Sequence, residues 1–384
     1  NNSQIILEQA DFDVTTLEKN SYYLVYHYKN NGNQDNQQGK SFSGTISVRI
    51  INEKMSFSEA LALCDDTASN CMIENAEKSE ELVYDETEDN NLRYIGADPN
   101  NYVSFNNELW RIIGVMNNID DGIERKETRL KIIRNESIGD YSWDSSDSTI
   151  NEGFGINEWS QSDIMKLLNP GYETELIGNS LYYYRGSGMC YSGVNNESAA
   201  CDFSSIGLLD DSKALIKNAL WNTGANNGSL YSYNNINTST FYELERSNNS
   251  GKYCFSTTLC NDTVTRQTSW IGLVGLMYSS DYGYATGGSS NKSRSECISE
   301  YLYSWNNDCT DNNWLYKNTF QWTLTPFATP SHTCRVYCVN CRNNSDTDDA
   351  YMSHSITPVV YLSSDVRISG GTGSSGDPFT LTVS

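Results

Sequence analysis

Eleven cysteines constrain what this chain can fold into, because most of them come in closely spaced pairs. A disulfide needs two Cα atoms within about 7 Å, so short spacings suit local bridges across a turn or a hairpin. Such bridges persist in oxidising surroundings, and the pattern therefore predicts an extracellular protein. An odd total leaves one sulfur unpaired or bonded to another chain. The pairs are Cys64 and Cys71, Cys190 and Cys201, Cys254 and Cys260, and Cys297 and Cys309, followed by a cluster of Cys334, Cys338 and Cys341.

The charge of the chain limits its partners. Its 384 residues include 49 acidic and 26 basic side chains, for a net charge of −23. Nucleic acids and anionic lipids attract Lys- and Arg-rich surfaces, so we expect neither as a partner. No run of about 18 apolar residues occurs, and we expect no membrane insertion of the mature chain. No signal peptide is recognisable, as expected for a mature form whose leader or anchor was removed.

Composition predicts a folded protein with an aromatic core. Apolar residues make up 38%, yet the chain holds 26 Tyr, 11 Phe and 8 Trp. Disordered chains are poor in aromatic residues, so we expect rings and disulfides to form the core. A chain of this length usually forms two or three units. The predicted fold class is α+β, with a small N-terminal β domain before a larger α+β domain with disulfide-stapled loops.

Residues 1–55 are predicted to form β-strands. Ser21–Tyr28 and Gly44–Ile51 are rich in β-branched and aromatic side chains, which favour strands. Gln4–Val14 is a further strand candidate that would pair within its own sheet or add to the sheet of a neighbouring copy. Head-to-tail addition of this kind builds a filament. The apolar residues of this assembly strand are Ile5, Ile6, Leu7, Phe12 and Val14.

A capping box marks the start of the next segment. Ser56 followed by Glu59 predicts a short helix, and the acidic, polar sequence after it suggests that residues 56–91 form a helix-containing linker. A second domain then spans 92–365. Residues 366–384 are predicted to form a Gly-rich turn and a final β-strand.

The second domain mixes strands and helices. Asn106 and Asn107 suit a tight turn, which predicts a hairpin of Tyr102–Phe105 and Glu108–Val115. Cap residues and helix breakers mark the helices. Further strands are predicted at Arg129–Arg134, Trp270–Met277, Phe320–Leu324 and Ile356–Leu362, and helices at Ser162–Leu168, Ser212–Trp221 and Glu296–Trp305.

Five segments, in order, resemble a widespread bacterial secreted domain of uncharacterised function. They are Leu109–Val115, Glu158–Asn169, Ile271–Tyr282, Gln321–Leu324 and Ile356–Leu362. This domain is similar to the C-type-lectin-like fold shared by formylglycine-generating enzymes and some adhesin tips, and the resemblance covers about residues 92–365. With the strands ahead of it, the chain also resembles surface proteins attached through a pilin-like or anchored N-terminus. The resemblance implies a fold and a cell-surface location, but one fold hosts many activities.

Residues 331–341 (SHTCRVYCVNC) hold the sharpest enzymatic candidate. They follow the Trp322 strand, where the resemblance implies a pair of cysteines that binds copper(I), a soft metal favoured by thiolates. A zinc site is the alternative. Its four ligands would be His332, Cys334, Cys338 and Cys341. The simpler interpretation is that two of these cysteines form a disulfide while the third is free or pairs elsewhere, and it assigns no catalytic residue.

Calcium and sugar binding are the remaining site hypotheses. The sequence Trp305–Cys309 is similar to the Trp-Asn-Asp calcium element of lectins with an extra Asn, and Asp98–Asn100 is the single Asp-Pro-Asn in the chain. A polar turn is the simpler interpretation of Trp305–Cys309. Exposed aromatic rings stack on sugars, and the alternative for each ring is core packing. The rings singled out are Trp305, Trp314 and Tyr183.

The leading hypothesis is a non-enzymatic extracellular or cell-surface protein. It would be a subunit of a fibre or pilus-like filament, or an adhesin, that assembles with copies of itself by strand addition. The first alternative is a carbohydrate-binding, lectin-like module whose partners are host or environmental glycans. The second is a copper- or thiol-dependent enzyme of the formylglycine-generating type. The leading hypothesis requires no cofactor, although calcium stays an open alternative.

Overall fold

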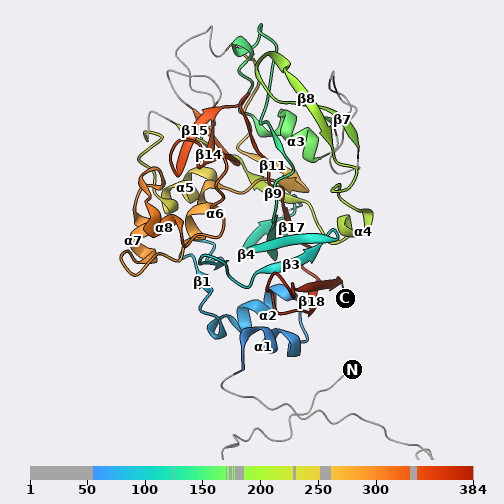
Figure 1. Ribbon diagram of the computed structural model, residues 1–384, viewed down its shortest axis with the longest axis vertical. Helices are drawn as coiled ribbons and strands as arrows, with labels where there is room; N and C mark the ends of the chain where they lie inside the picture. Colours follow the sequence, from blue (N-terminus) through green and yellow to red (C-terminus); the bar gives the residue numbers. More distant parts are fainter. Residues whose placement is uncertain are drawn as a thin grey trace, which may run out of the picture. The chain divides into compact units, whose positions relative to one another are not determined.

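The computed structural model describes residues 55–383 apart from a few short segments. Those segments are 124, 170, 173–174, 176, 178–185, 228–230, 251–260 and 329–334. The chain divides into two compact units, residues 1–51 and 52–384. The strands predicted in the first unit, including the assembly strand, lie outside the described residues. Figure 1 shows that the second unit contains many strands and a few short helices, which confirms the α+β class.

The larger sheet has seven strands in the order β1-β2-β4-β5-β17-β12, with β3 pairing to β4. Its strands are β1 (Leu82–Tyr84), β2 (Leu92–Tyr94), β3 (Tyr102–Phe105), β4 (Glu108–Asp120), β5 (Lys126–Arg134), β12 (Val274–Gly275) and β17 (Val359–Tyr361). Strands β3 and β4 form the predicted hairpin, and its turn residues Asn106 and Asn107 both have φ of 59°. A two-residue turn of this hand needs positive φ at both positions, which Asn tolerates better than most residues.

The second sheet has six strands in the order β15-β14-β13-β16-β6, with β10 pairing to β13. Its strands are β6 (Asp140–Ser142), β10 (Asn226–Asn227), β13 (Gln321–Ala328), β14 (Arg335–Val339), β15 (Ser345–Asp349) and β16 (Ser353–Ser355). Among the described residues, three two-stranded ribbons complete the sheets. They pair β7 (Ser187–Tyr191) with β8 (Ser198–Asp202), β9 (Ala219–Asn222) with β11 (Ser269–Gly272), and β18 (Val366–Gly370) with β19 (Thr380–Val383).

The helices are short and several begin at side-chain caps. They are α1 (Phe57–Leu63), α2 (Ala68–Glu74), α3 (Asp163–Leu168), α4 (Asp210–Lys213), α5 (Thr238–Glu245), α6 (Ser279–Tyr284), α7 (Arg294–Ser299) and α8 (Asn307–Thr310). Ser56 and Glu59 form the predicted capping box of α1, and Ser162 caps α3. A capped backbone N–H stabilises a helix by about 1 kcal/mol, which matters for helices of so few turns. In the described part of the chain, no helix is long and apolar enough to cross a membrane.

Residues 56–91, predicted to be a linker, instead pack into the second unit. Leu61, Met72 and Leu82 are buried in the same hydrophobic cluster as the sheets, and β1 pairs with β2. The acidic side chains between them suggested a solvated segment. The apolar residues in this segment are spaced with the periods of a helix and of a strand, so they form one buried face although the segment as a whole is polar.

Two predicted helices are shorter than expected. Helix α4 ends at Lys213, and the end of the helix that we predicted over Ser212–Trp221 lies in strand β9 (Ala219–Asn222). Its Ala219 and Trp221 are buried while the residues between and after them are partly exposed, so pairing with β11 overrides the helical propensity. Helix α7 ends at Ser299, and Leu302–Ser304 form a separate 3-10 turn.

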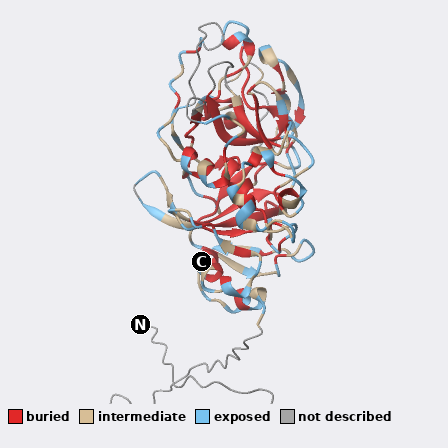
Figure 2. Ribbon diagram, turned by 90° about the vertical axis from the view of Figure 1, so that its left-hand side faces the viewer, coloured by how far each residue is buried: buried red, intermediate tan, exposed pale blue. Residues whose placement is uncertain are grey.

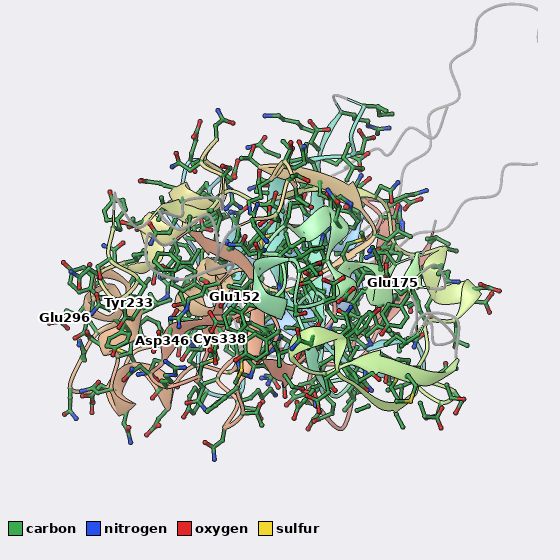
Figure 3. The ribbon with its side chains drawn as sticks, turned by 90° about the horizontal axis from the view of Figure 1, so that it is seen from above. Glu152, Glu175, Tyr233, Glu296, Cys338 and Asp346 are labelled. Atoms are coloured by element: carbon green, nitrogen blue, oxygen red, sulfur yellow. A yellow bond between two sulfur atoms is a disulfide. The ribbon has the colours of Figure 1, made fainter. Side chains whose placement is uncertain are left out.

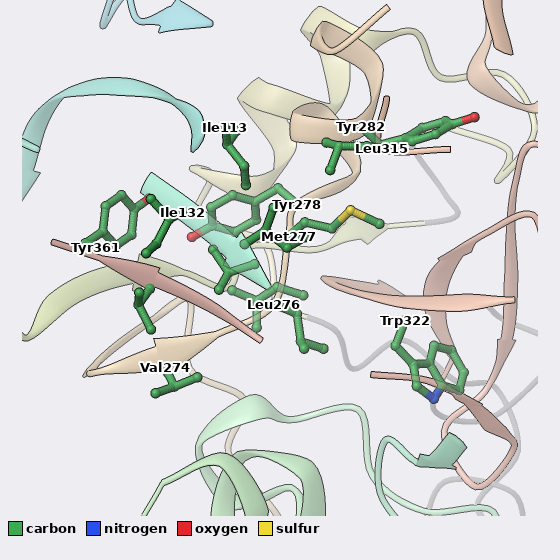
Figure 4. Packing of buried hydrophobic residues seen from close by; sticks show 14 of the residues in the cluster. Ile113, Ile132, Val274, Leu276, Met277, Tyr278, Tyr282, Leu315, Trp322 and Tyr361 are labelled. Atoms are coloured by element: carbon green, nitrogen blue, oxygen red, sulfur yellow. The ribbon is translucent and has the colours of Figure 1, made fainter. Parts of the chain in front are cut away.

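The core is built from aromatic rings, as composition predicted. Figure 2 shows buried residues along the central strands and exposed residues on outer loops. Five tryptophans are almost completely buried, namely Trp110, Trp143, Trp159, Trp221 and Trp322. Figure 4 shows part of this core, between the strands that carry Ile132, Val274 and Tyr361 and the segment from Leu276 to Tyr278.

Candidate functional site

Four disulfides connect near neighbours in the chain, as the cysteine spacing predicted. They are Cys64–Cys71, Cys190–Cys201, Cys297–Cys309 and Cys338–Cys341. Their Cα atoms lie between 5.6 and 5.9 Å apart, inside the usual range for a disulfide. Cys254, Cys260 and Cys334 lie outside the described residues, so the pairing of Cys254 with Cys260 and an odd cysteine that is free or bonded to another chain stay predictions.

The Cys338–Cys341 bridge lies beside a histidine in the second sheet. Cys338 is in β14, and Cys341 follows a turn in which Asn340 has φ of 58°. The sulfur atoms and a ring nitrogen of His354, from β16, all lie within 4.8 Å of one another, and the three residues are buried. Figure 3 shows Cys338 close to Asp346, which pairs with it across β14 and β15. The side-chain set Cys, Cys and His is one that holds zinc or copper(I).

His354 was not among the predicted site residues. We assigned the ligand role to His332, which is adjacent to the cysteines in sequence and lies outside the described residues. The second sheet places His354 near the cysteines instead, because its strand β16 lies two strands from β14, with β13 between them. A sequence pattern cannot show this order, because β16 pairs with a strand that precedes it by some thirty residues.

Hydrogen bonds fix the orientation of the His354 ring. Its Nδ1 lies 2.8 Å from the backbone oxygen of Ser353, and its Nε2 lies 3.2 Å from Asp348 Oδ2. The Trp322 ring packs on the other side, with ring centroids 4.4 Å apart. Burial raises the pKa of Asp348, but the hydrogen bond and charge of His354 outweigh burial, and the pKa is lower than usual.

A second cluster of chemically active groups surrounds Asp281 of α6. Lys131 Nζ lies 2.5 Å from Asp281 Oδ2, and Arg93 donates to Asp281 Oδ1 at 2.7 Å. Arg93 also donates to Asp85 Oδ2 at 2.7 Å. The backbone N–H of Tyr278 donates to Asp281 at 3.0 Å. One carboxylate thus joins β2 and β5 of the larger sheet to the start of α6.

Aromatic rings surround the ammonium group of Lys131. Its Nζ lies 4.2 Å from the Tyr278 ring centroid and 5.4 Å from those of Trp221 and Tyr361. Burial lowers the pKa of Lys131 to about 8, although Asp281 opposes this. Burial also disfavours the charged form of Asp281, but its two cations reverse this and lower its pKa to about 2. The side chains of Lys131 and Asp281 are each 1% exposed, so this cluster is a cross-link within the core.

A pair of buried carboxyl groups lies near α3. Asp144 accepts from the backbone N–H of Asp163 at 3.0 Å, and Asp163 accepts from the backbone N–H of Ser145 at 2.8 Å. Burial raises the pKa of both, and the negative charge of Asp163 raises that of Asp144 further. The pKa of Asp163 rises to about 7. Each carboxyl group caps backbone donors, so the pair organises the chain before α3.

The aromatic rings that we singled out for sugar stacking are in the core or undescribed. Trp305 and Trp314 are buried, and their indole N–H groups donate to the backbone oxygens of Cys297 and Tyr94. Core packing, the alternative interpretation, describes both, and neither offers a ring face to a sugar. Tyr183 lies outside the described residues.

The residues of the calcium hypothesis are engaged in protein hydrogen bonds. Asn306 caps α8, and Asp308 accepts from Ser289 at 2.9 Å. Asp98 pairs with Arg111 at 2.9 Å. These contacts fit the polar-turn interpretation of Trp305–Cys309.

No family model, curated protein or solved structure matches this chain. The resemblance to the C-type-lectin-like fold therefore stays a prediction, and so do the functions that it implies.

Proposed function

We propose that this protein is an extracellular structural protein, a subunit of a fibre or an adhesin. The carrying observation is the set of four local disulfides among the described residues, because such bridges accumulate in proteins exposed to oxidising surroundings. The net charge of −23, which disfavours nucleic acid and anionic lipid as partners, fits the same role. The C-type-lectin-like fold, common to some adhesin tips, belongs to this proposal.

Assembly would proceed by strand addition from residues 4–14. Electron microscopy of the purified full chain tests this, with fibres as the expected result and no fibres after deletion of residues 1–14. A matched variant keeps the chain length, namely Ile5→Asp with Leu7→Asp, since residues two apart share one face of a strand. Fibres that persist without residues 1–14 would contradict strand addition, and an intact chain that stays monomeric would contradict the filament.

A glycan-binding role is the second candidate, favoured by a group of tyrosines that the sequence analysis missed. Tyr231 is 42% exposed and Tyr301 is 45% exposed. Tyr233 lies two positions after Tyr231, and Tyr303 lies two positions after Tyr301. The rings of Tyr233 and Tyr303 contact each other, with centroids 5.7 Å apart. A backbone bridge between Asn237 and Tyr301 joins the two segments. Exposed rings beside polar groups form a surface that suits sugar faces.

A glycan array compares the intact protein with two alanine variants. Tyr231→Ala with Tyr301→Ala should abolish binding, whereas Tyr84→Ala, which removes a ring that is 40% exposed elsewhere, should leave it unchanged. Equal binding by both variants, or none by the intact protein with and without calcium, would contradict this candidate.

The thiol or copper enzyme is the weakest of the three candidates. Such an enzyme needs accessible thiols, whereas Cys338 and Cys341 are buried and bonded to each other. Titration of free thiols in the native protein tests it, with two reduced cysteines among Cys334, Cys338 and Cys341 required.

A further inference from the structure

We propose that Cys338, Cys341 and His354 form a latent binding site for a divalent cation of the zinc class, available when the Cys338–Cys341 disulfide is reduced, with Asp348 as the residue that positions the histidine ring. This proposal is independent of the proposed structural role. It concerns a group of side chains that the second sheet brings together from β14, β15 and β16, with β13 between β14 and β16, and from the turn after β14.

The spacing of the ligand atoms suits a tetrahedral site. The two sulfurs and the His354 nitrogen all lie within 4.8 Å of one another. With metal–sulfur bonds of about 2.3 Å and metal–nitrogen bonds of about 2.0 Å, the edges of a zinc tetrahedron run from about 3.3 to 3.8 Å. Small side-chain movements after reduction therefore reach the required geometry. The Cys-x-x-Cys spacing itself is typical of zinc sites on a tight turn.

The hydrogen bonding of His354 prepares its Nε2 for a metal. The backbone oxygen of Ser353, 2.8 Å from Nδ1, can only accept, so Nδ1 carries the proton and donates. Nε2 faces Asp348 Oδ2, and it gives up this hydrogen bond and the proton in it when it binds the cation. Histidine ligands of metals commonly donate their other nitrogen to a backbone carbonyl, which fixes the tautomer and the ring orientation.

Asp348 positions the His354 ring and leaves the fourth coordination position to water. Its Oδ2 lies 3.2 Å from His354 Nε2. Its Oδ1 accepts from the backbone N–H of Asp349 at 3.1 Å and lies 3.4 Å from Arg342. These contacts orient the carboxylate and leave Oδ2 directed at the ring.

The disulfide controls whether this site exists. Both sulfurs must be thiolates to bind the cation, so the closed bridge excludes it. A dithiol reductant opens the bridge by exchange: the disulfide gains two electrons and two protons and becomes two thiols, while the reductant becomes a disulfide. Each thiol then releases its proton as it binds the cation. In oxidising surroundings the bridge stays closed and stabilises the turn.

Cobalt(II) is a suitable probe because its thiolate complexes absorb light by charge transfer. The full chain is reduced with a phosphine in the absence of oxygen and titrated with cobalt(II), and zinc is then added in competition. We expect one equivalent of cobalt(II) with thiolate charge-transfer absorption, its displacement by zinc, and no such absorption from the oxidised protein.

Reduction also opens the other disulfides, so the decisive variant leaves every cysteine in place. His354→Gln should weaken cobalt(II) binding more than tenfold, and Asp348→Asn should weaken it by about 10–100-fold. The control Cys64→Ser with Cys71→Ser should bind as the parent does. Circular dichroism establishes that each variant is folded. A reduced parent that binds no cobalt(II), or His354→Gln that binds it equally well, would overturn the proposal.

Discussion

The charge cluster at Asp281 predicts that two substitutions in one ion pair have very different effects. Asp281→Asn leaves both Lys131 and Arg93 without the carboxylate that lies 2.5 and 2.7 Å from them. Breaking one buried ion pair costs about 3–5 kcal/mol. Arg93 keeps Asp85, so we expect a loss near 4 kcal/mol rather than twice that amount. Such a loss is a large part of a typical free energy of unfolding of about 5–15 kcal/mol.

Lys131→Met should cost much less. Burial lowers the pKa of Lys131 from 10.5 to about 8. This shift means that the charged form of Lys131 is about 3 kcal/mol less favourable in the protein than in water. Methionine removes that charge at similar volume, and Asp281 keeps Arg93 and the Tyr278 N–H. We expect a change below about 1.5 kcal/mol.

Chemical denaturation of the disulfide-intact variants at pH 7, followed by circular dichroism and tryptophan fluorescence, measures both changes. Asp65→Asn is the matched control, because its 2.7 Å pair with Arg367 is exposed to solvent and should have little effect. Lys131→Met as destabilising as Asp281→Asn would refute the reasoning.

Three further predictions concern stability. The parent should lose stability as the pH rises from about 4 to about 7, because a pKa raised to about 7 in the folded state makes the folded protein hold this proton more tightly than the unfolded chain; Asp163→Asn should reduce this loss and leave the part due to Asp144, and parallel pH profiles of the melting temperature would contradict it. Replacing both Cys297 and Cys309 by Ser, across a separation of 12 residues, should cost about 3 kcal/mol in urea unfolding, and an unchanged midpoint would count against it. Gly114→Ala should cost about 1–3 kcal/mol, since its Cβ would lie 2.2 Å from the backbone oxygen of Leu92; a stable, well-expressed variant would show that β2 and β4 can separate.

Local signals in the sequence predicted local structure. The Asn106–Asn107 turn, the Ser56 capping box and the short cysteine spacings each depend on residues a few positions apart, and the described structure contains all three. The stretch from Ser212 to Trp221 shows the limit of such signals. Helical propensity favoured one helix there, but the partner strand β11 lies some fifty residues later and determines the conformation of Ala219–Asn222.

The candidate sites depend on contacts that the sequence does not encode locally. Lys131 and Asp281 are 150 residues apart, and neither has a neighbour in sequence that marks it as part of a charge cluster. His354 reaches Cys338 only through the strand order of the second sheet, whereas His332, the alternative zinc ligand that we named, is nearer to the cysteines in sequence. Trp305 and Trp314 looked like candidate binding residues because burial of a single ring cannot be judged from composition.

The short reach of the four described disulfides has a mechanical consequence. None of these four joins residues more than 12 positions apart, so they would not carry a force that pulls on the described residues from distant points. Each of them would keep a small loop from extending, while the strands between them could be drawn out once the sheets shear. As part of a tether, such a protein would yield and lengthen under load.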